Sequence, residues 1–198
     1  MTSFPDKRDE DALEAQLREV FGRIVYTHKT HEKMADRFAA ANRFFQWTQT
    51  VLAAVTTTAL LFVVFGNSRE GAVISAVLST LLLVLNLILQ NNDLGRRAEK
   101  HTETAAQLWG IRETYLSLIT DLLSPNPDIA LIKRERDRLQ DLCERIFTSG
   151  PRTDARAYKT AQRGIKNNEE FTFSEQEIDL LIPEELRKST RRREEARA

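Results

Sequence analysis

The sequence predicts an all-α membrane protein: a two-helix transmembrane hairpin with long cytoplasmic helical extensions and a third packing helix. Residues 44–68 and 71–92 are uncharged, and both reach the roughly 20 mostly apolar residues that a helix needs to cross a bilayer. Only Arg69 and Glu70 separate these stretches, so the connection is short. The 7 glycines and 5 prolines among 198 residues suit long helices and disfavour a sheet-rich fold.

The first element is one continuous helix from about residue 12 to about residue 65, because no proline interrupts its pattern before the membrane. Its transmembrane part is expected at about 44–65. The cytoplasmic part, about 30 residues, would extend roughly 45 Å from the bilayer. Gly66 suits a helix C-cap in a turn that continues through Asn67 and Ser68. The apolar stripe that predicts this helix is Leu13, Leu17, Val20, Ile24, His28, His31, Ala35 and Phe38.

The second helix is expected to cross the membrane at about 72–92 and to continue past Asp93. A short turn makes neighbours of consecutive helices, so the two cytoplasmic arms should pair antiparallel. The matching stripe on this arm is Leu94, Ala98, His101, Ala105, Leu108, Tyr115, Ile119 and Leu122.

A third helix is expected to follow a proline-containing break and to end near Thr148. Asn126 is the predicted N-cap and Pro127 the first helical residue. The helix should fold back on the two arms as a three-helix cytoplasmic layer. Its apolar face consists of Ile129, Ile132, Leu139, Leu142 and Ile146.

The chain is expected to divide into a helical domain, residues 12–149, and a C-terminal cytoplasmic segment, residues 150–198. The second segment should contain short helices, because residues 154–166 are weakly helical and Ser174 begins a capping box with Glu177. It ends in a basic tail, which is expected to be solvated. The basic residues of that tail are Arg187, Lys188, Arg191, Arg192, Arg193 and Arg197.

Nothing in the sequence predicts catalysis. It contains no glycine-rich phosphate loop and no nucleophile–base ordering on a plausible scaffold, so neither an enzyme nor a cofactor is expected. The 29 basic and 29 acidic residues cancel, and no direct nucleic-acid binding is predicted. Cys143 is the only cysteine, which indicates a reducing compartment, and it is expected to pack in the third helix.

Flanking charge predicts the orientation in the membrane. Basic residues precede the first span and follow the second, whereas the connection offers Arg69 offset by Glu70. Basic flanks stay in the cytoplasm, so both termini should be inside.

A buried hairpin in a soluble protein is the alternative to a membrane hairpin, since helices that are apolar all round also fill large cores. The chain has too little other apolar surface to wrap two such helices.

The three histidines form the most distinctive polar feature. With the turn centred near residue 67, His31 lies level with about residue 104, so His28, His31 and His101 should converge within about one helical turn of 5.4 Å. A polar layer that sets the register of the helices is the favoured interpretation. A zinc site is the alternative, but spacing alone is weak support for it. If no site exists, His31→Leu should leave stability unchanged or raise it.

Polar residues also lie within the spans. Ser75, Ser79 and Asn86 fall on or near one face of the second span, and an asparagine in hydrocarbon is unfavourable unless it finds a partner or water. These side chains are candidates either to line a pore or to pack helices together in a dry contact. One hairpin is too thin to enclose water, so a conducting path would require several copies.

Two segments carry a resemblance to a known family. The residues before the first span read Tyr26-x-His28-Lys29-Thr30-His31-Glu32-Lys33, with Phe171-Thr172-Phe173-Ser174, Glu177-Ile178-Asp179 and Pro183 near the C-terminus. Together with the close hairpin, they resemble the SLATT family over about residues 13–188. This family consists of small two-transmembrane proteins associated with bacterial nucleotide-sensing defence systems.

The resemblance implies a membrane effector in the bacterial inner membrane that self-associates and forms a pore when a partner detects a phage. It also implies partners encoded nearby: a nucleotidyltransferase, a nucleotide sensor or a reverse transcriptase. Two alternatives stay open at this point. The protein could be a non-catalytic membrane anchor or adaptor for a soluble sensor, or a small ion channel subunit.

Overall fold

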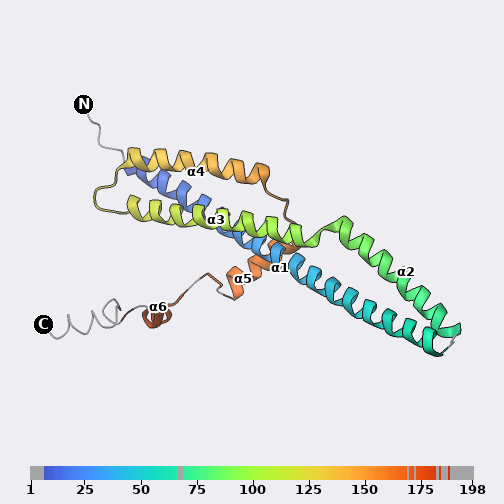
Figure 1. Ribbon diagram of the computed structural model, residues 1–198. Helices are drawn as coiled ribbons and strands as arrows, with labels where there is room; N and C mark the ends of the chain where they lie inside the picture. The colour runs from blue at the N-terminus through green and yellow to red at the C-terminus, as the bar shows by residue number, and fades with distance from the viewer. Residues whose placement is uncertain are drawn as a thin grey trace. The chain divides into compact units, whose positions relative to one another are not determined.

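The computed structural model contains only helices as regular secondary structure in the residues it describes, which confirms the predicted all-α class (Figure 1). It describes residues 7–66, 69–168, 170–171, 173–181, 183 and 187. The helices are α1 (Lys7–Gly66), α2 (Arg69–Asn92), α3 (Leu94–Leu122), α4 (Ile129–Ser149), α5 (Ala155–Asn167) and α6 (Glu175–Leu181). The predicted turn residues Asn67 and Ser68 lie outside the described residues.

Helix α1 is a single helix of 60 residues, as its uninterrupted pattern predicts. At about 1.5 Å per residue it extends roughly 90 Å. It already includes Lys7, the first residue described, whereas the prediction began near residue 12. Asp9 and Glu10 in its first turn suit the positive end of the helix dipole. Most of the predicted stripe is buried, while Val20 and Phe38 are half-buried.

The prediction that the second helix continues past Asp93 is wrong. Asp93 has φ 38° and ψ 57°, a left-handed backbone conformation, and it separates α2 from α3. Its side chain caps the new helix by accepting a hydrogen bond from the amide of Arg96. A short polar side chain of this kind tolerates the left-handed region better than most residues do. Figure 1 shows the resulting change of direction between the two helices.

Helix α4 packs beside α3 as predicted, but it begins two residues later than the proline suggested. The N-cap is Asp128, whose Oδ1 accepts from the amide of Leu131 at 2.9 Å, and Asn126 and Pro127 lie in the preceding loop. The core of this part of the chain lies between α1, α3 and α4. It consists of Leu13, Leu17, Ile24, Leu108, Ile111, Tyr115, Leu118, Leu122, Ile132, Leu139 and Ile146. The predicted three-helix layer is therefore confirmed (Figure 1).

The chain divides into two compact units, one ending at Tyr158 and the other beginning at Lys159, within α5. In the second unit, Ser174 and Glu177 form the predicted capping box at the start of α6. The amide of Ser174 donates to Oε2 of Glu177 at 2.7 Å, and the amide of Glu177 donates to Oγ of Ser174 at 3.2 Å. Of the basic tail, only Arg187 lies among the described residues.

Candidate functional site

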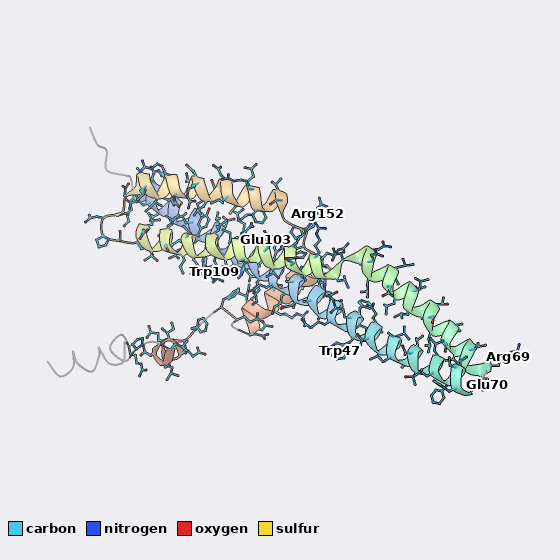
Figure 2. All side chains as sticks on the ribbon, viewed as in Figure 1. Trp47, Arg69, Glu70, Glu103, Trp109 and Arg152 are labelled. Carbon is cyan, nitrogen blue, oxygen red and sulfur yellow. The ribbon has the colours of Figure 1, made fainter. Side chains whose placement is uncertain are left out.

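The apolar surface of α2 and of the second half of α1 is exposed. The most apolar window of each helix is only 6% buried within the protein. A core helix of a soluble protein would bury this surface, so the buried-hairpin alternative fails. Figure 2 places Arg69 and Glu70 at the far end of the hairpin and Trp47 on the part of α1 nearer the three-helix layer. Trp47 is 70% exposed and suits the interface between lipid and water.

Two small hydroxyl side chains are buried in the hairpin. Thr56 of α1 and Ser75 of α2 are 7% and 3% exposed. Each satisfies its hydroxyl within its own helix: Thr56 donates to the carbonyl of Leu52 at 2.7 Å, and Ser75 to that of Gly71 at 2.8 Å. Small residues with internally satisfied hydroxyls allow two membrane helices to approach closely. Ser75 therefore lies between the two helices of the hairpin rather than on an outer face.

Asn86 has a partner on the other span. Its Oδ1 accepts a hydrogen bond of 2.6 Å from Nε2 of Gln49 on α1, although Asn86 is itself exposed. Ser79 lies on the same side of α2 and is also exposed. Of the three residues predicted on this span, Ser75 lies inside the hairpin, whereas Ser79 and Asn86 lie at its surface. Gln49 escaped the sequence analysis, which named polar candidates on the second span alone.

In the three-helix layer, His31 of α1 and His101 of α3 meet as the antiparallel register predicts. Their Nδ1 atoms lie 2.9 Å apart, with both side chains buried. Burial, followed by the neighbouring His101, lowers the pKa of His31 to about 4. Burial, followed by Arg37, also lowers the pKa of His101. With both rings neutral, one proton lies between the two Nδ1 atoms. One ring therefore donates through Nδ1, and the Nδ1 of the other ring accepts.

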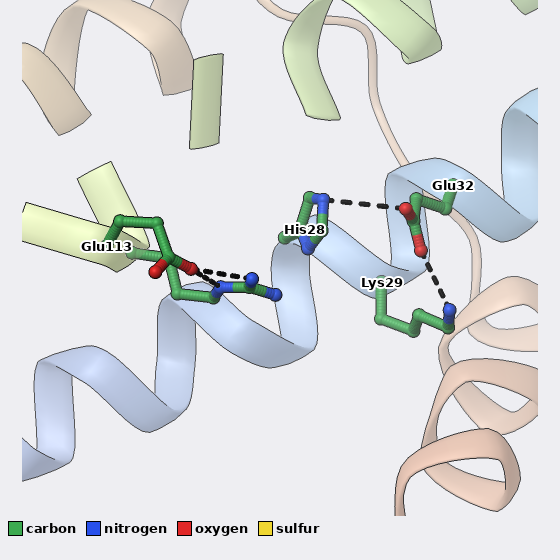
Figure 3. A network of polar contacts seen from close by, with 5 residues as sticks. His28, Lys29, Glu32 and Glu113 are labelled. Atoms are coloured by element: carbon green, nitrogen blue, oxygen red, sulfur yellow. Dashed lines mark hydrogen bonds and ion pairs between the residues drawn. The ribbon is translucent and has the colours of Figure 1, made fainter. Parts of the chain in front are cut away.

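His28 lies one turn before His31 on α1 and is also buried. Figure 3 shows its Nε2 directed at Oε1 of Glu32, 3.6 Å away, while Nζ of Lys29 reaches Oε2 of the same carboxylate at 2.8 Å. Burial lowers the pKa of His28, and Glu32 partly opposes that effect. The negative charge of Glu32 therefore compensates the positive charge of Lys29, which is only 9% exposed. In the described parts of the chain, no three His, Cys or carboxylate side chains are placed together to hold a metal ion.

The other residues of the motif lie around these groups. Thr30 is buried and donates to the carbonyl of Tyr26 at 2.7 Å. The ring of Tyr26 lies 5.9 Å from that of Tyr158, between centroids. Lys33 is half-buried on α1. The motif thus supplies contacts on several sides of one helix.

A second polar contact near the histidines escaped the sequence analysis. Arg37 donates two hydrogen bonds to Asp154, from Nη1 to Oδ1 at 3.3 Å and from Nη2 to Oδ2 at 2.5 Å. Hydrogen bonding to Arg37 is the largest cause of the lowered pKa of Asp154. The same carboxylate caps α5 by accepting from the amide of Ala157 at 2.8 Å. Phe38 stacks on His101 with 5.6 Å between ring centroids. Sequence periodicity could not predict the ion pair, because its partners are 117 positions apart.

Residues 13–177 match the SMODS and SLOG-associating 2TM effector domain family 4, which is a SLATT family. The chain belongs to this family. The matched range contains the hairpin, both arms, α4, α5 and the first residues of α6. Comparison with curated proteins and with solved structures returns no match.

Membership in this family confirms the resemblance carried by the Lys29–Lys33 motif and the close hairpin. The family is one of two-transmembrane effector domains, and the structure has two exposed apolar helices of sufficient length. The protein is therefore a membrane protein with an effector domain. The polar contacts of the three-helix layer and the Gln49–Asn86 contact of the hairpin are the two candidate functional regions.

Proposed function

We propose that the protein is the membrane effector of a bacterial antiphage defence system. On activation by a nucleotide-sensing partner it oligomerises and forms a pore in the inner membrane or disrupts it. The observation that carries this proposal is the exposed hairpin, only 6% buried in each apolar window, in a member of an effector-domain family. Both termini lie in the cytoplasm, as the basic flanks predict. The action requires no catalytic step and no cofactor.

Self-association follows from the size of the hairpin. Two helices cannot enclose water, and backbone groups in lipid must be satisfied within helices, so a conducting path requires several copies. Exposed polar side chains such as Ser79 and Asn86 then either line the path or join copies. Both roles place these residues away from lipid in the active state.

The fold offers a direct connection between the cytoplasm and the membrane. Helix α1 is continuous from the three-helix layer through the first span, so a displacement at His31 is carried along one rigid element. The second connection passes through Asp93, where the helix is interrupted. A partner that binds the layer can therefore move the spans against each other. A nucleotidyltransferase, a nucleotide sensor or a reverse transcriptase encoded nearby would supply the signal.

Membrane potential tests the proposal. Bacteria that express this protein with its neighbouring sensor gene should depolarise rapidly after phage challenge, and cells with the sensor alone should not. Asn86→Leu should abolish depolarisation and toxicity, because it removes a polar group from the exposed edge.

Asn92→Leu is the matched control. It makes the same change at another exposed asparagine of α2, whose amide donates to the carbonyl of Ile88 within its own helix at 2.8 Å. This variant should depolarise like the unaltered protein. An intact potential, with the unaltered protein in the membrane and the sensor active, would favour the adaptor function instead.

A further inference from the structure

The hydrogen bond between Gln49 and Asn86 joins the two uncharged stretches that are expected to span the membrane. Gln49 is six residues beyond Arg43, and Asn86 is seven residues before Asp93, the nearest charged residues of the two helices. At about 1.5 Å per residue, both amides lie roughly 10 Å along their helices from these charges. Water becomes scarce toward the middle of a span, so polar groups inside a span depend on protein partners.

The two amides use only part of their hydrogen-bonding capacity. Nε2 of Gln49 donates to Oδ1 of Asn86, and within the described residues no partner is seen for Oε1 of Gln49 or Nδ2 of Asn86. The threonines of the spans differ, because their hydroxyls donate to carbonyls four residues earlier in their own helices. These threonines are Thr48, Thr50, Thr56, Thr57, Thr58 and Thr80.

The unused groups lie at the outer edge of the hairpin. Asn86 is exposed while it bonds across to α1, so its side chain lies at the border of the helix contact. Ser79 is exposed on the same side of α2, and its hydroxyl has no partner in the described chain. The acceptor Oε1 of Gln49 and the donors of Asn86 and Ser79 therefore lie along one edge that faces lipid. Leaving them unsatisfied there is unfavourable.

We propose that this edge, defined by Gln49, Ser79 and Asn86, is the contact between copies of the chain in the membrane. A second copy related by a two-fold axis brings the same groups, so that Nδ2 of each Asn86 donates to Oε1 of Gln49 in the other copy. Such an isologous contact satisfies both amides at once. Lipid acyl chains offer neither a donor nor an acceptor. The inference rests on the proposed function and names the contact through which the effector assembles.

Disulfide crosslinking in native membranes tests this contact. Because Cys143 is the only cysteine, a Cys143→Ser protein is a clean background. Ser79→Cys in this background should give crosslinked dimers on oxidation. Val77→Cys is the matched control: Val77 is 55% exposed at nearly the same depth, but it lies on the other side of α2. It should crosslink much less. Equal crosslinking at both positions would overturn the proposal.

The contribution of the Asn86 side-chain amide to this contact is tested in the Ser79→Cys protein. Asn86→Leu should lower dimer formation about five- to ten-fold, because two interhelical hydrogen bonds in a membrane contribute about 1 kcal/mol together. Asn86→Gln keeps the amide and should preserve most of the crosslinking. A crosslink that is insensitive to Asn86→Leu would mean that another surface joins the copies.

Depolarisation, measured in the same cells, separates this inference from the proposed function. Depolarisation without a Ser79→Cys crosslink would leave the effector function standing and reject this edge as the contact. A crosslink that depends on Asn86, in cells whose potential stays intact after sensor activation, would support the contact and reject the effector function.

Discussion

The pair formed by His31 and His101 is the most consequential residue-scale feature of the three-helix layer. Removing one partner of a buried hydrogen bond leaves the other unsatisfied, which costs about 1–3 kcal/mol. His31→Leu should therefore destabilise the protein, contrary to the expectation from the sequence that, without a metal site, this substitution leaves stability unchanged or raises it. The double variant with His101→Leu should lose less than the sum of the single losses. Thermal unfolding of the purified protein in detergent measures both, and strictly additive losses would contradict the pairing.

The same histidines predict acid sensitivity. Burial lowers the pKa of His31 to about 4 and also lowers the pKa values of His28 and His101 below their usual 6.5. The unfolded chain therefore binds more protons between about pH 6.5 and pH 4, so stability is full above this range and falls as pH decreases through it. Melting temperatures recorded from pH 8 to pH 4.5 should decline mainly below pH 6.5. The double histidine variant should show a flatter profile.

At the scale of elements, the break at Asp93 determines how α2 joins α3. Asp93→Asn should be nearly neutral, because asparagine tolerates the left-handed conformation and can cap α3. Asp93→Leu should cost about 2 kcal/mol, roughly one from the backbone and one from the lost cap. Thermal unfolding of the two variants checks this ordering. Equal stability of both would indicate that the interruption is not held by this residue.

Periodicity predicted most helices but not their joints. The stripe continues in phase from Leu94, so a single residue of left-handed backbone at Asp93 changes direction without disturbing the pattern that sequence analysis reads. The third helix illustrates a different ambiguity. Asn126 and Asp128 are both suitable caps, and the position of Pro127 favoured the first, but the structure uses the second. Local propensity does not separate such neighbours.

The candidate regions were predictable to the extent that they follow from antiparallel register. A short turn determines which residues of two helices are level. This register predicts that His31 lies near His101, and the two side chains are in contact. The same register brings Gln49 level with Asn86. Gln49 was missed because the sequence analysis named polar candidates on the second span alone and did not apply the register to their partners. The contact between Arg37 and Asp154 depends on the path of a loop, which no periodicity predicts.

At the scale of the whole molecule, the orientation in the membrane decides where a partner and a signal can act. The proposed orientation, with both termini inside, puts the turn at Arg69 in the periplasm and Glu103 of α3 in the cytoplasm. Figure 2 shows Arg69 at the tip of the hairpin and Glu103 in the three-helix layer. In a Cys143→Ser background, Arg69→Cys should react with a membrane-impermeant maleimide in intact spheroplasts. Glu103→Cys should react only after permeabilisation.

Both cysteines would replace exposed charged residues, so a difference in labelling reports membrane protection rather than burial in the protein. The reverse pattern would place the three-helix layer outside the cell, where a cytoplasmic nucleotide signal could not reach it. The three-helix layer also contains the histidines and the Lys29–Lys33 motif, so this one measurement determines the side of the membrane on which these residues lie. Labelling at Arg69→Cys alone would place the layer on the cytoplasmic side, where the proposed partner could bind it.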